Sequence, residues 1–213
     1  MTAPALESRN ATEAAILEAA REAIAEEGYD RVTIDGIAKR AFVSRTSVYF
    51  YFPNKRAVVD RLIQRTFSDI YAAGAPYLRG EGDPRAELHA AIARVVMVVN
   101  RNADMLLLAA KLYGEEDRLP PEWEPYIRRL VVAAERRIRR DQERGVAPAD
   151  ISPRISAQAL TAMVERHITV EVVRGGGSAT ESIRVLAELW WRAVYCWPDA
   201  VAGAPSDSGA PSA

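Results

Sequence analysis

The chain has 213 residues, with 28 basic and 29 acidic side chains, a formal net charge of −1 and 49% hydrophobic residues. This length can bury a sizeable core, either in one large domain or in a small domain joined to a larger one. A single cysteine, Cys196, excludes a disulfide framework and any multi-cysteine zinc or iron–sulfur site. The balanced charge argues against a uniformly basic nucleic-acid coat, but it permits a local one.

Membrane segments are not expected from the hydrophobic pattern. The first ten residues carry no apolar core of the secretory type, and the longest stretch without a polar residue runs only from Met105 to Ala110. A membrane-spanning helix needs about 20 apolar residues. We therefore expect a cytoplasmic protein with no membrane partner.

Hydrophobic residues recur with a helical period along almost the whole chain. An apolar stripe over 12–27 stops at Gly28, and Thr33 and Ser44 are N-cap candidates for two short helices that end at Ala41 and before Pro53. The remaining patterns predict helices over 55–73, 85–101, 103–113, 121–144, 154–174 and 179–197. No segment alternates as a strand does, so the fold class is all-α with about nine helices.

Positive charge and aromatic rings concentrate between Arg31 and Val59. This stretch has six basic residues and one acidic residue, Asp35, and it contains five of the twelve Phe and Tyr residues of the chain. Local positive charge interleaved with aromatics is typical of a nucleic-acid-binding surface. A solvated face beside a small core explains the composition equally well, so the spacing of the residues must decide.

The spacing from Thr33 to Tyr49 is that of a helix-turn-helix. Ala38 is small enough for two helices to touch, and Ile37, Val43 and Val48 supply the apolar contacts between them. A second helix that begins at Ser44 would turn its first residues outward, where such helices meet base edges in the major groove. Arg45 can bind guanine, the hydroxyls of Thr46 and Ser47 can bind bases or phosphates, and Phe50 can contact a thymine methyl.

The same residues resemble the N-terminal DNA-binding domain of the TetR family of repressors, whose pattern T–IA–A–VS–Y-x-YF–K recurs here from Thr33 to Lys55. The resemblance implies that Thr33, Tyr49, Tyr51 and Lys55 hold the phosphate backbone while residues 45–50 read the base sequence. Tyr51 and Phe52 could instead be mainly core residues. The predicted DNA-binding set is Thr33, Ser44, Arg45, Thr46, Ser47, Tyr49, Phe50, Tyr51 and Lys55.

Phe42 departs from the family pattern, which usually has glycine in the turn. Phenylalanine is strained at positive φ. We therefore expect either a reshaped turn or a longer first helix of the motif, and a structural role for Phe42 rather than a DNA contact.

The EthR-like branch of the family is resembled by the string TSVYFYFPNKRAV. A weaker resemblance to the same branch lies in segments of the C-terminal half such as ERGVAP. The resemblance implies an N-terminal DNA-binding domain over 1–54 and an effector-binding and dimerisation domain over 55–200. We also expect a disordered arm at 1–10 and, from its low-complexity composition, a disordered tail at 201–213. The resemblance also implies a long channel for a lipophilic effector.

The channel is expected to have mostly apolar walls with a few polar groups. For any single residue, an ordinary core role remains the alternative. Several positions that are aromatic or amide in the EthR-like branch differ here, which favours a different and bulkier ligand. The predicted ligand-binding residues are Phe67, Tyr71, Val95, Val99, Met105, Trp123, Tyr126, Ile127, Leu130, Thr161, Val164, His167 and Trp190.

A broad apolar face on the last helix predicts a homodimer. Its residues are Ile183, Leu186, Ala187, Ala193, Val194 and Trp197. The sequence thus predicts a ligand-responsive transcriptional regulator, a repressor that binds a palindromic DNA operator as a dimer and is released by a small hydrophobic effector. We expect no cofactor, metal site or enzymatic activity. The alternatives are an all-α enzyme, for which Glu165, Arg166 and His167 are the candidate groups, and a sequence-indifferent DNA-binding protein.

Overall fold

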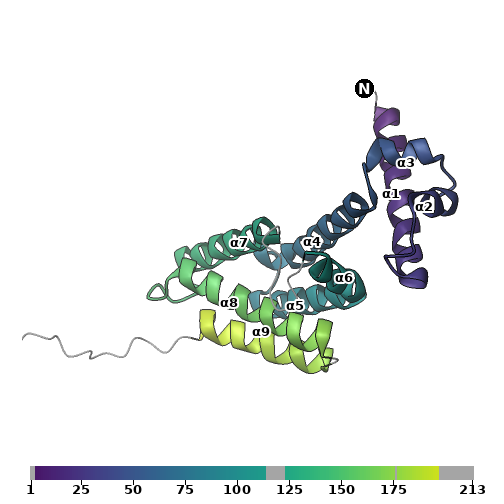
Figure 1. Cartoon of the computed structure of the whole chain (residues 1–213). Helices are drawn as coiled ribbons and strands as arrows, with labels where there is room; N and C mark the ends of the chain where they lie inside the picture. Colours follow the sequence, from purple (N-terminus) through teal and green to yellow (C-terminus); the bar gives the residue numbers. More distant parts are fainter. Residues whose placement is uncertain (1–2, 114–122, 176, 197–213) are drawn as a thin grey trace, which may run out of the picture.

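The computed structural model describes residues 3–113, 123–175 and 177–196. In these segments the chain forms nine α-helices and one π-helical segment without any strand, which confirms the all-α prediction. Three N-terminal helices form a small unit at one end of an elongated molecule, and α4 leads from this unit into a larger bundle (Figure 1). None of the described helices is apolar over a length that could cross a bilayer.

The small unit contains α1 (Ala3–Glu27), α2 (Ile34–Arg40) and α3 (Arg45–Tyr51). The helix α1 covers residues 3–10, so most of the segment expected to be an arm is helical. Its buried stripe, which includes Ile16 and Ala20, packs with Ile37 of α2 and Val48 of α3 in a common core. Two helices as short as α2 and α3 owe their stability to this packing rather than to their own hydrogen bonds.

The helix α4 (Lys55–Arg79) is longer than the sequence indicates. Its expected end near Gly74 and Pro76 is wrong, because both residues lie inside the helix and Gly74, Ala75 and Tyr77 are buried. Proline inside a helix removes one backbone hydrogen bond and crowds the carbonyl group four residues earlier, at a cost of about 3 kcal/mol. The burial of this segment compensates that cost. The helix ends at Gly80, whose left-handed φ of 83° supports the C-cap.

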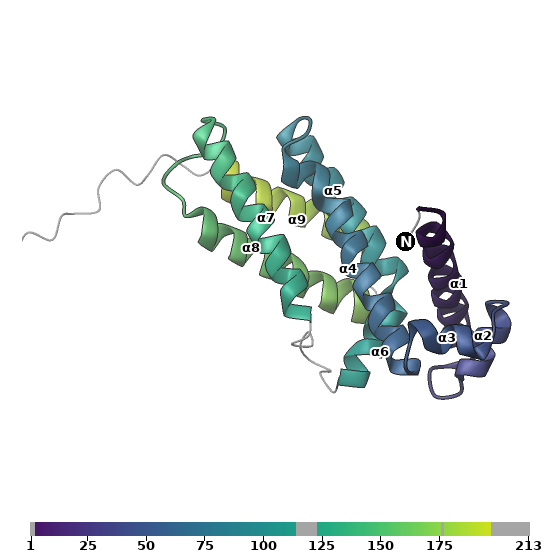
Figure 2. The same ribbon diagram turned by 90° about the horizontal axis from the view of Figure 1, so that it is seen from above.

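The bundle is completed by α5 (Pro84–Arg101), α6 (Ala103–Tyr113), α7 (Glu124–Glu143), α8 (Pro153–His167), η2 (Ile168–Arg174) and α9 (Ala179–Tyr195). The helix α5 packs against α4 and α9, and α7 packs against α8 (Figure 2). The helix expected over 154–174 changes to π-helical geometry at Ile168. Single-turn π segments are frequently found at functional sites.

Candidate nucleic-acid interface and effector cavity

The first turn of α3 faces solvent, as the sequence predicts. Ser44 is the N-cap, and its Oγ accepts a hydrogen bond from the backbone N–H of Ser47 at 3.0 Å. Arg45, Thr46 and Phe50 are exposed, whereas Val48 is fully buried and anchors the helix to the core. The predicted base-reading side chains therefore share one accessible face, except that Ser47 is half-buried and its hydroxyl lies 2.8 Å from that of Ser44.

Arg45 is held in place by two neighbours. Its Nη1 lies 3.1 Å from Oδ2 of Asp35 on α2, and its Nη2 donates to the hydroxyl of Tyr49 at 3.4 Å. The pKa of Arg45 is raised by the hydrogen bond to Tyr49 and by the Asp35 charge. Because the pair is exposed, solvent screens it strongly, so Asp35 orients Arg45 without binding it tightly.

Phe42 adopts φ = 57° and is 97% exposed. The expected rearrangement of the turn is wrong, and so is the expected packing role of the ring. The turn keeps its left-handed residue, the first helix of the motif is not lengthened, and the ring packs against no core. The turn is held by backbone hydrogen bonds from Phe42 N–H to the Lys39 carbonyl oxygen at 3.2 Å and from Val43 N–H to the Ala38 carbonyl oxygen at 3.0 Å. Ile37, Ala38 and Val48 on either side of it are buried in the core.

Lys55 and Thr33 have local structural roles beside any contact to DNA. The Lys55 ammonium donates to the carbonyl oxygen of Tyr29 at 2.6 Å and lies 4.2 Å from the centre of its ring. Thr33 is the N-cap of α2, with Oγ1 3.0 Å from the Gly36 nitrogen. Tyr51 is half-buried against the core, while Tyr49 is 42% exposed.

Part of the positive charge between Arg31 and Val59 is neutralised by acidic side chains of the same chain. Arg40 lies 2.7 Å from Glu26 and also pairs with Glu22 and Glu27, which ties α2 to α1. The hydrogen bond from Arg40 lowers the pKa of Glu26. The exposed cationic surface near α3 is therefore smaller than the sequence count of six basic residues indicates.

The C-terminal bundle contains a partly open, apolar cavity of about 160 Å³ between α4, α5, α6, α7, α8, η2 and α9. An engineered cavity of about 150 Å³ in a protein core binds benzene, so the space as it stands suits a small molecule rather than a bulky one. The predicted residues that line it are Phe67, Val95, Val99, Trp123, Ile127, Leu130, Thr161, Val164 and Trp190.

Four other predicted ligand-binding residues do not line the cavity, so their assignment is corrected. The Tyr71 ring lies under the guanidinium of Arg129, and Tyr126 stacks on the outer side of the Phe67 ring at 4.9 Å between centroids. Met105 is buried in the general core. His167 bonds through Nε2 to Ser182 Oγ at 2.9 Å and so joins α8 to α9.

Sequence reasoning missed the part of the cavity wall that follows the expected end of α4. Gly74, Tyr77 and Leu78 line the cavity because α4 continues through Pro76. On the opposite side, Glu165 and Thr169 line it as polar groups, with Thr169 Oγ1 donating to Glu165 Oε1 at 3.0 Å. The local signals of Gly74 and Pro76 indicated a helix end before Tyr77, so the sequence pattern did not reveal the first group.

A buried polar network holds the cavity residues Tyr77 and Trp190. Trp190 Nε1 donates to the Tyr77 hydroxyl at 3.2 Å, and that hydroxyl lies 3.0 Å from the hydroxyl of Tyr195. Tyr195 donates to Asp141 at 2.6 Å, and Asp141 accepts from Arg137 Nε at 2.6 Å. Burial raises the pKa of Tyr77 and of Tyr195, so both phenols stay protonated.

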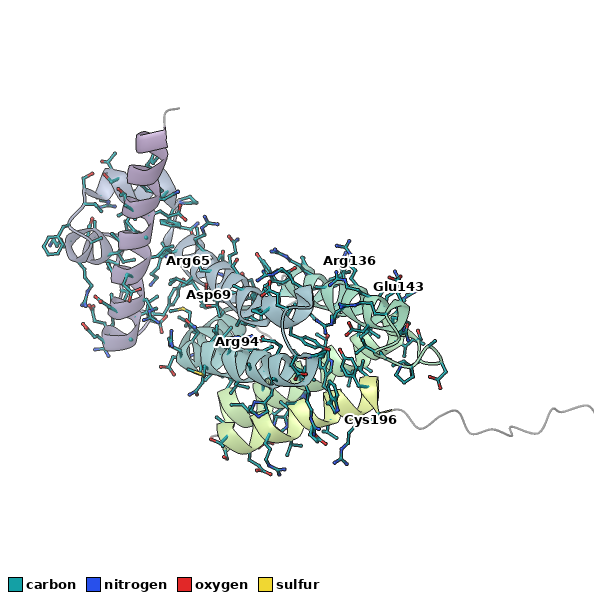
Figure 3. All side chains as sticks on the ribbon, turned by 180° about the vertical axis from the view of Figure 1, so that it is seen from behind. Arg65, Asp69, Arg94, Arg136, Glu143 and Cys196 are labelled. Atoms are coloured by element: carbon teal, nitrogen blue, oxygen red, sulfur yellow. The ribbon has the colours of Figure 1, made fainter. Side chains whose placement is uncertain are left out.

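The two ends of α4 are fastened to different helices. At its C-terminal end, Arg137 of α7 donates to the Tyr77 carbonyl oxygen at 2.7 Å. At its N-terminal end, Arg56 donates to the carbonyl oxygen of Leu112 on α6 at 2.9 Å, and Tyr113 donates to Asp60 at 2.7 Å. In between, Arg94 of α5, labelled in Figure 3, donates to the backbone of α4 at Ala73, 2.9 Å away.

Three residues of the predicted dimer face lie inside the single subunit. Leu186, Ala187 and Val194 are buried, because this side of α9 packs on α5 and α8. Their side chains have no surface left for a second chain. Ile183 and Ala193 are half-buried, and Trp197 lies outside the described residues. The outward side of α9 instead exposes Leu189, which is 47% accessible.

Comparison with known proteins agrees with both halves of this arrangement. Residues 16–62 match the family described as "Bacterial regulatory proteins, tetR family", and residues 88–196, more than half of the chain, match the C-terminal domain of "Transcriptional regulator EthR". The HTH-type transcriptional regulator EthR of Mycolicibacterium smegmatis is 28% identical over 193 residues, which cover 86% of each chain.

Solved structures show the same fold. The fatty acid degradation regulator FadR from Bacillus halodurans superimposes with a TM-score of 0.65 at 18% identity, over 84% of this chain and 94% of that one. SmeT, the repressor of the Stenotrophomonas maltophilia multidrug efflux pump SmeDEF, gives 0.65 at 21% identity, over 85% and 89%. The protein therefore belongs to the TetR family of bacterial transcriptional regulators and carries a C-terminal domain of the EthR type.

Proposed function

We propose that this protein is a ligand-responsive repressor, which binds a palindromic operator as a homodimer and leaves it when a small lipophilic effector fills the cavity. One observation carries the proposal. The helix α4 runs without interruption from Lys55, which follows closely after the end of α3 at Tyr51, to Tyr77 in the cavity wall. A change at the cavity therefore has a rigid path to the DNA-binding unit (Figure 1).

In the proposed complex, the first turn of α3 enters the major groove. Arg45 donates to a guanine, Thr46 bonds to a base or a phosphate, and Phe50 packs on a thymine methyl. Further contacts, mainly to the DNA phosphate backbone, come from Tyr49, Tyr51, Thr33, Ser44 and Ser47. Lys55 keeps its bond to Tyr29 or exchanges it for a phosphate, since an ammonium group has three donors.

The proposed response to effector is a shift in the balance between two positions of α4. Phe67, Ile70 and Tyr77 form one cavity wall, so a ligand pushes on the middle and C-terminal part of the helix. Arg137 holds the end of α4 at Tyr77, and α6, which is bonded to the N-terminal end of α4, also lines the cavity. The displacement is therefore passed to the DNA-binding unit by α4 and α6 together. A ligand acts only through a difference in its affinity for the two positions.

The proposed dimer uses the outward faces of α8 and α9. Ile155 and Leu189 are large apolar side chains exposed on these two helices, and Ala162 is a small exposed residue on α8. Two-fold pairing would present two α3 helices to one side of a duplex, separated by about one helical turn of 34–36 Å. The operator is then expected to have two-fold symmetry.

The proposal is tested by selecting bound duplexes from a random-sequence pool with the purified full chain. We expect one enriched sequence with two inverted half-sites, bound at least about 10³-fold more tightly than random duplex at the same salt concentration. No enrichment, together with equal affinity for all duplexes, would show a sequence-indifferent DNA-binding protein instead. No binding to any duplex would leave the cavity without a regulatory role and favour another function.

A further inference from the structure

Asp35 is an acidic residue on the surface that is expected to meet DNA phosphates. It is the one acidic residue between Arg31 and Val59, and its side chain is 53% exposed. It lies in the first turn of α2, within contact distance of the first residue of α3. A carboxylate near phosphates weakens the binding of every duplex, because like charges repel. At this place the carboxylate is therefore unfavourable for DNA binding unless it has a second role.

The partner of this carboxylate is Arg45, the side chain that we expect to read a base. Asp35 Oδ2 accepts a hydrogen bond from Arg45 Nη1 at 3.1 Å, and the Tyr49 hydroxyl accepts one from Nη2 at 3.4 Å. The guanidinium carbon also lies 5.4 Å from the centre of the Tyr49 ring. The two terminal nitrogens of Arg45 are thus held by residues of two different helices, which restricts the orientation of the guanidinium plane.

Arg45 has enough donors to bind a base while it keeps both of these neighbours. A guanidinium has five N–H donors, and the contacts with Asp35 and Tyr49 use two of them. A guanine takes two more, at O6 and N7. The ion pair with Asp35 can therefore persist in the bound complex, where it supports the contact to the base instead of competing with it.

The ion pair becomes stronger when DNA covers it. In the free protein the Arg45 side chain is 61% exposed, so water screens the pair and its contribution to stability is small. Bound DNA replaces part of this water, and the attraction between the two charges increases as the effective dielectric constant falls. Fixing one flexible side chain at an interface costs about two- to tenfold in affinity. A pair that forms on the protein side offsets part of this cost.

We propose that Asp35 is a positioning residue for operator recognition, which directs the Arg45 guanidinium toward a guanine while its own charge weakens the binding of every duplex. This inference rests on the proposed operator binding and specifies a source of its sequence preference. The two effects of the carboxylate have opposite signs. Asp35 lowers the general affinity for DNA, and it raises the preference for the operator over other sequences.

The test uses Asp35→Asn, which keeps the size of the side chain and removes its charge. Dissociation constants of the full chain are measured at one salt concentration for the selected operator and for a random duplex. We expect the affinity for the random duplex to rise about twofold, because one screened charge repulsion is lost. The preference for the operator over the random duplex should fall about fivefold, because Arg45 must then be fixed by the DNA alone.

Glu26→Gln is the matched control for the change in charge. Glu26 is also an exposed acidic residue of the N-terminal unit, and it pairs with Arg40 at 2.7 Å between α1 and α2. The variant removes the same charge without touching Arg45. It should change the affinities for the operator and for the random duplex by the same factor, so that the preference stays as in the wild type.

A double variant separates the positioning of Arg45 from a general structural role of Asp35. In the Arg45→Ala background, Asp35→Asn should leave the remaining preference unchanged, although it still raises the affinity for the random duplex. An unchanged preference in Asp35→Asn alone, or the same loss of preference with and without Arg45, would overturn the inference. A wild-type chain that enriches no operator would instead refute the proposed function, and this inference with it.

Discussion

Phe42 has a strained backbone conformation, although the surrounding helix-turn-helix is regular. The sequence correctly indicates that phenylalanine is a poor residue for a helix-turn-helix turn. It does not indicate whether the turn changes its shape or the phenylalanine adopts a strained conformation. The backbone hydrogen bonds of Phe42 and Val43 keep the turn in shape, so Phe42 accepts a φ of 57° with its ring in solvent. The strain is therefore concentrated in a single residue.

Replacing Phe42 by glycine should stabilise the protein. The left-handed conformation costs an L-residue roughly 1–2 kcal/mol, and part of the gain is offset by the greater freedom of glycine in the unfolded chain. We expect the free energy of unfolding to rise by about 0.5–1 kcal/mol in urea titrations. Phe42→Ala, which keeps the Cβ atom, should give no such rise. Equal stability of the glycine and alanine variants would show that position 42 is unstrained.

Arg45 is expected to read a base rather than to add general affinity. Arg45→Ala should cost about 1–3 kcal/mol of binding to the selected operator and relax the preference at one base pair of each half-site. The matched control is Arg128→Ala on α7, since Arg128 is also an exposed arginine beside a carboxylate. Affinities are compared at one salt concentration. If Arg45→Ala weakens operator and random duplex alike, Arg45 contacts only phosphate.

At the level of single elements, helix periodicity located most of the helices well. The bounds of α5 and α6 agree with the predicted 85–101 and 103–113 within one residue. The exceptions are the places where tertiary packing overrides a local stop signal. Pro76 remains within α4 because the surrounding residues are buried, and this interaction involves chain segments far away in sequence. No local pattern contains that information.

The buried pair of α7 should dominate the stability of the bundle. Arg137 and Asp141 are each 2% exposed, and removing one partner of such a pair leaves an uncompensated buried charge. Burial opposes the charge of Arg137, yet the hydrogen bond to Asp141 keeps its pKa above the ordinary value. Asp141→Asn should therefore lower the free energy of unfolding by about 3–5 kcal/mol.

Glu135→Gln is the matched control for that change. Glu135 pairs with Arg139 at the same spacing on the same helix, at 2.6 Å, but at the surface. Exposed pairs of this kind contribute only a few tenths of a kcal/mol. Chemical denaturation of the two variants compares them directly. A loss for Asp141→Asn no greater than that for Glu135→Gln would mean that the network around Tyr77 is not a structural anchor.

At the scale of the whole molecule, the sequence located two functional regions but could not separate the inner and outer sides of one helix. The stripes of α5, α7 and α8 correctly supplied most cavity residues, since one side of each helix must face the bundle interior. For α9, residues of the subunit core were wrongly assigned to the dimer interface. Leu186 and Val194 are core, and only the packing of α5 against α9 reveals this.

The proposed dimer surface makes a prediction about assembly. Leu189→Arg places a charge on the outward side of α9 and should shift the protein from dimer to monomer in sedimentation analysis, because an unpaired charge at an apolar interface is costly. Val132→Arg on α7, a partly exposed aliphatic residue on another face, serves as control and should stay dimeric. Unchanged dimers of both variants would place the interface elsewhere.

The central claim is that two α3 helices meet the same side of one duplex. It is tested most directly by inserting five base pairs between the half-sites of the selected operator, which turns one half-site by about half a helical turn. We predict that this duplex binds at least tenfold more weakly than the parent, and that a ten-base-pair insertion weakens binding less. Equal affinity for the parent and the five-base-pair insertion would contradict the account.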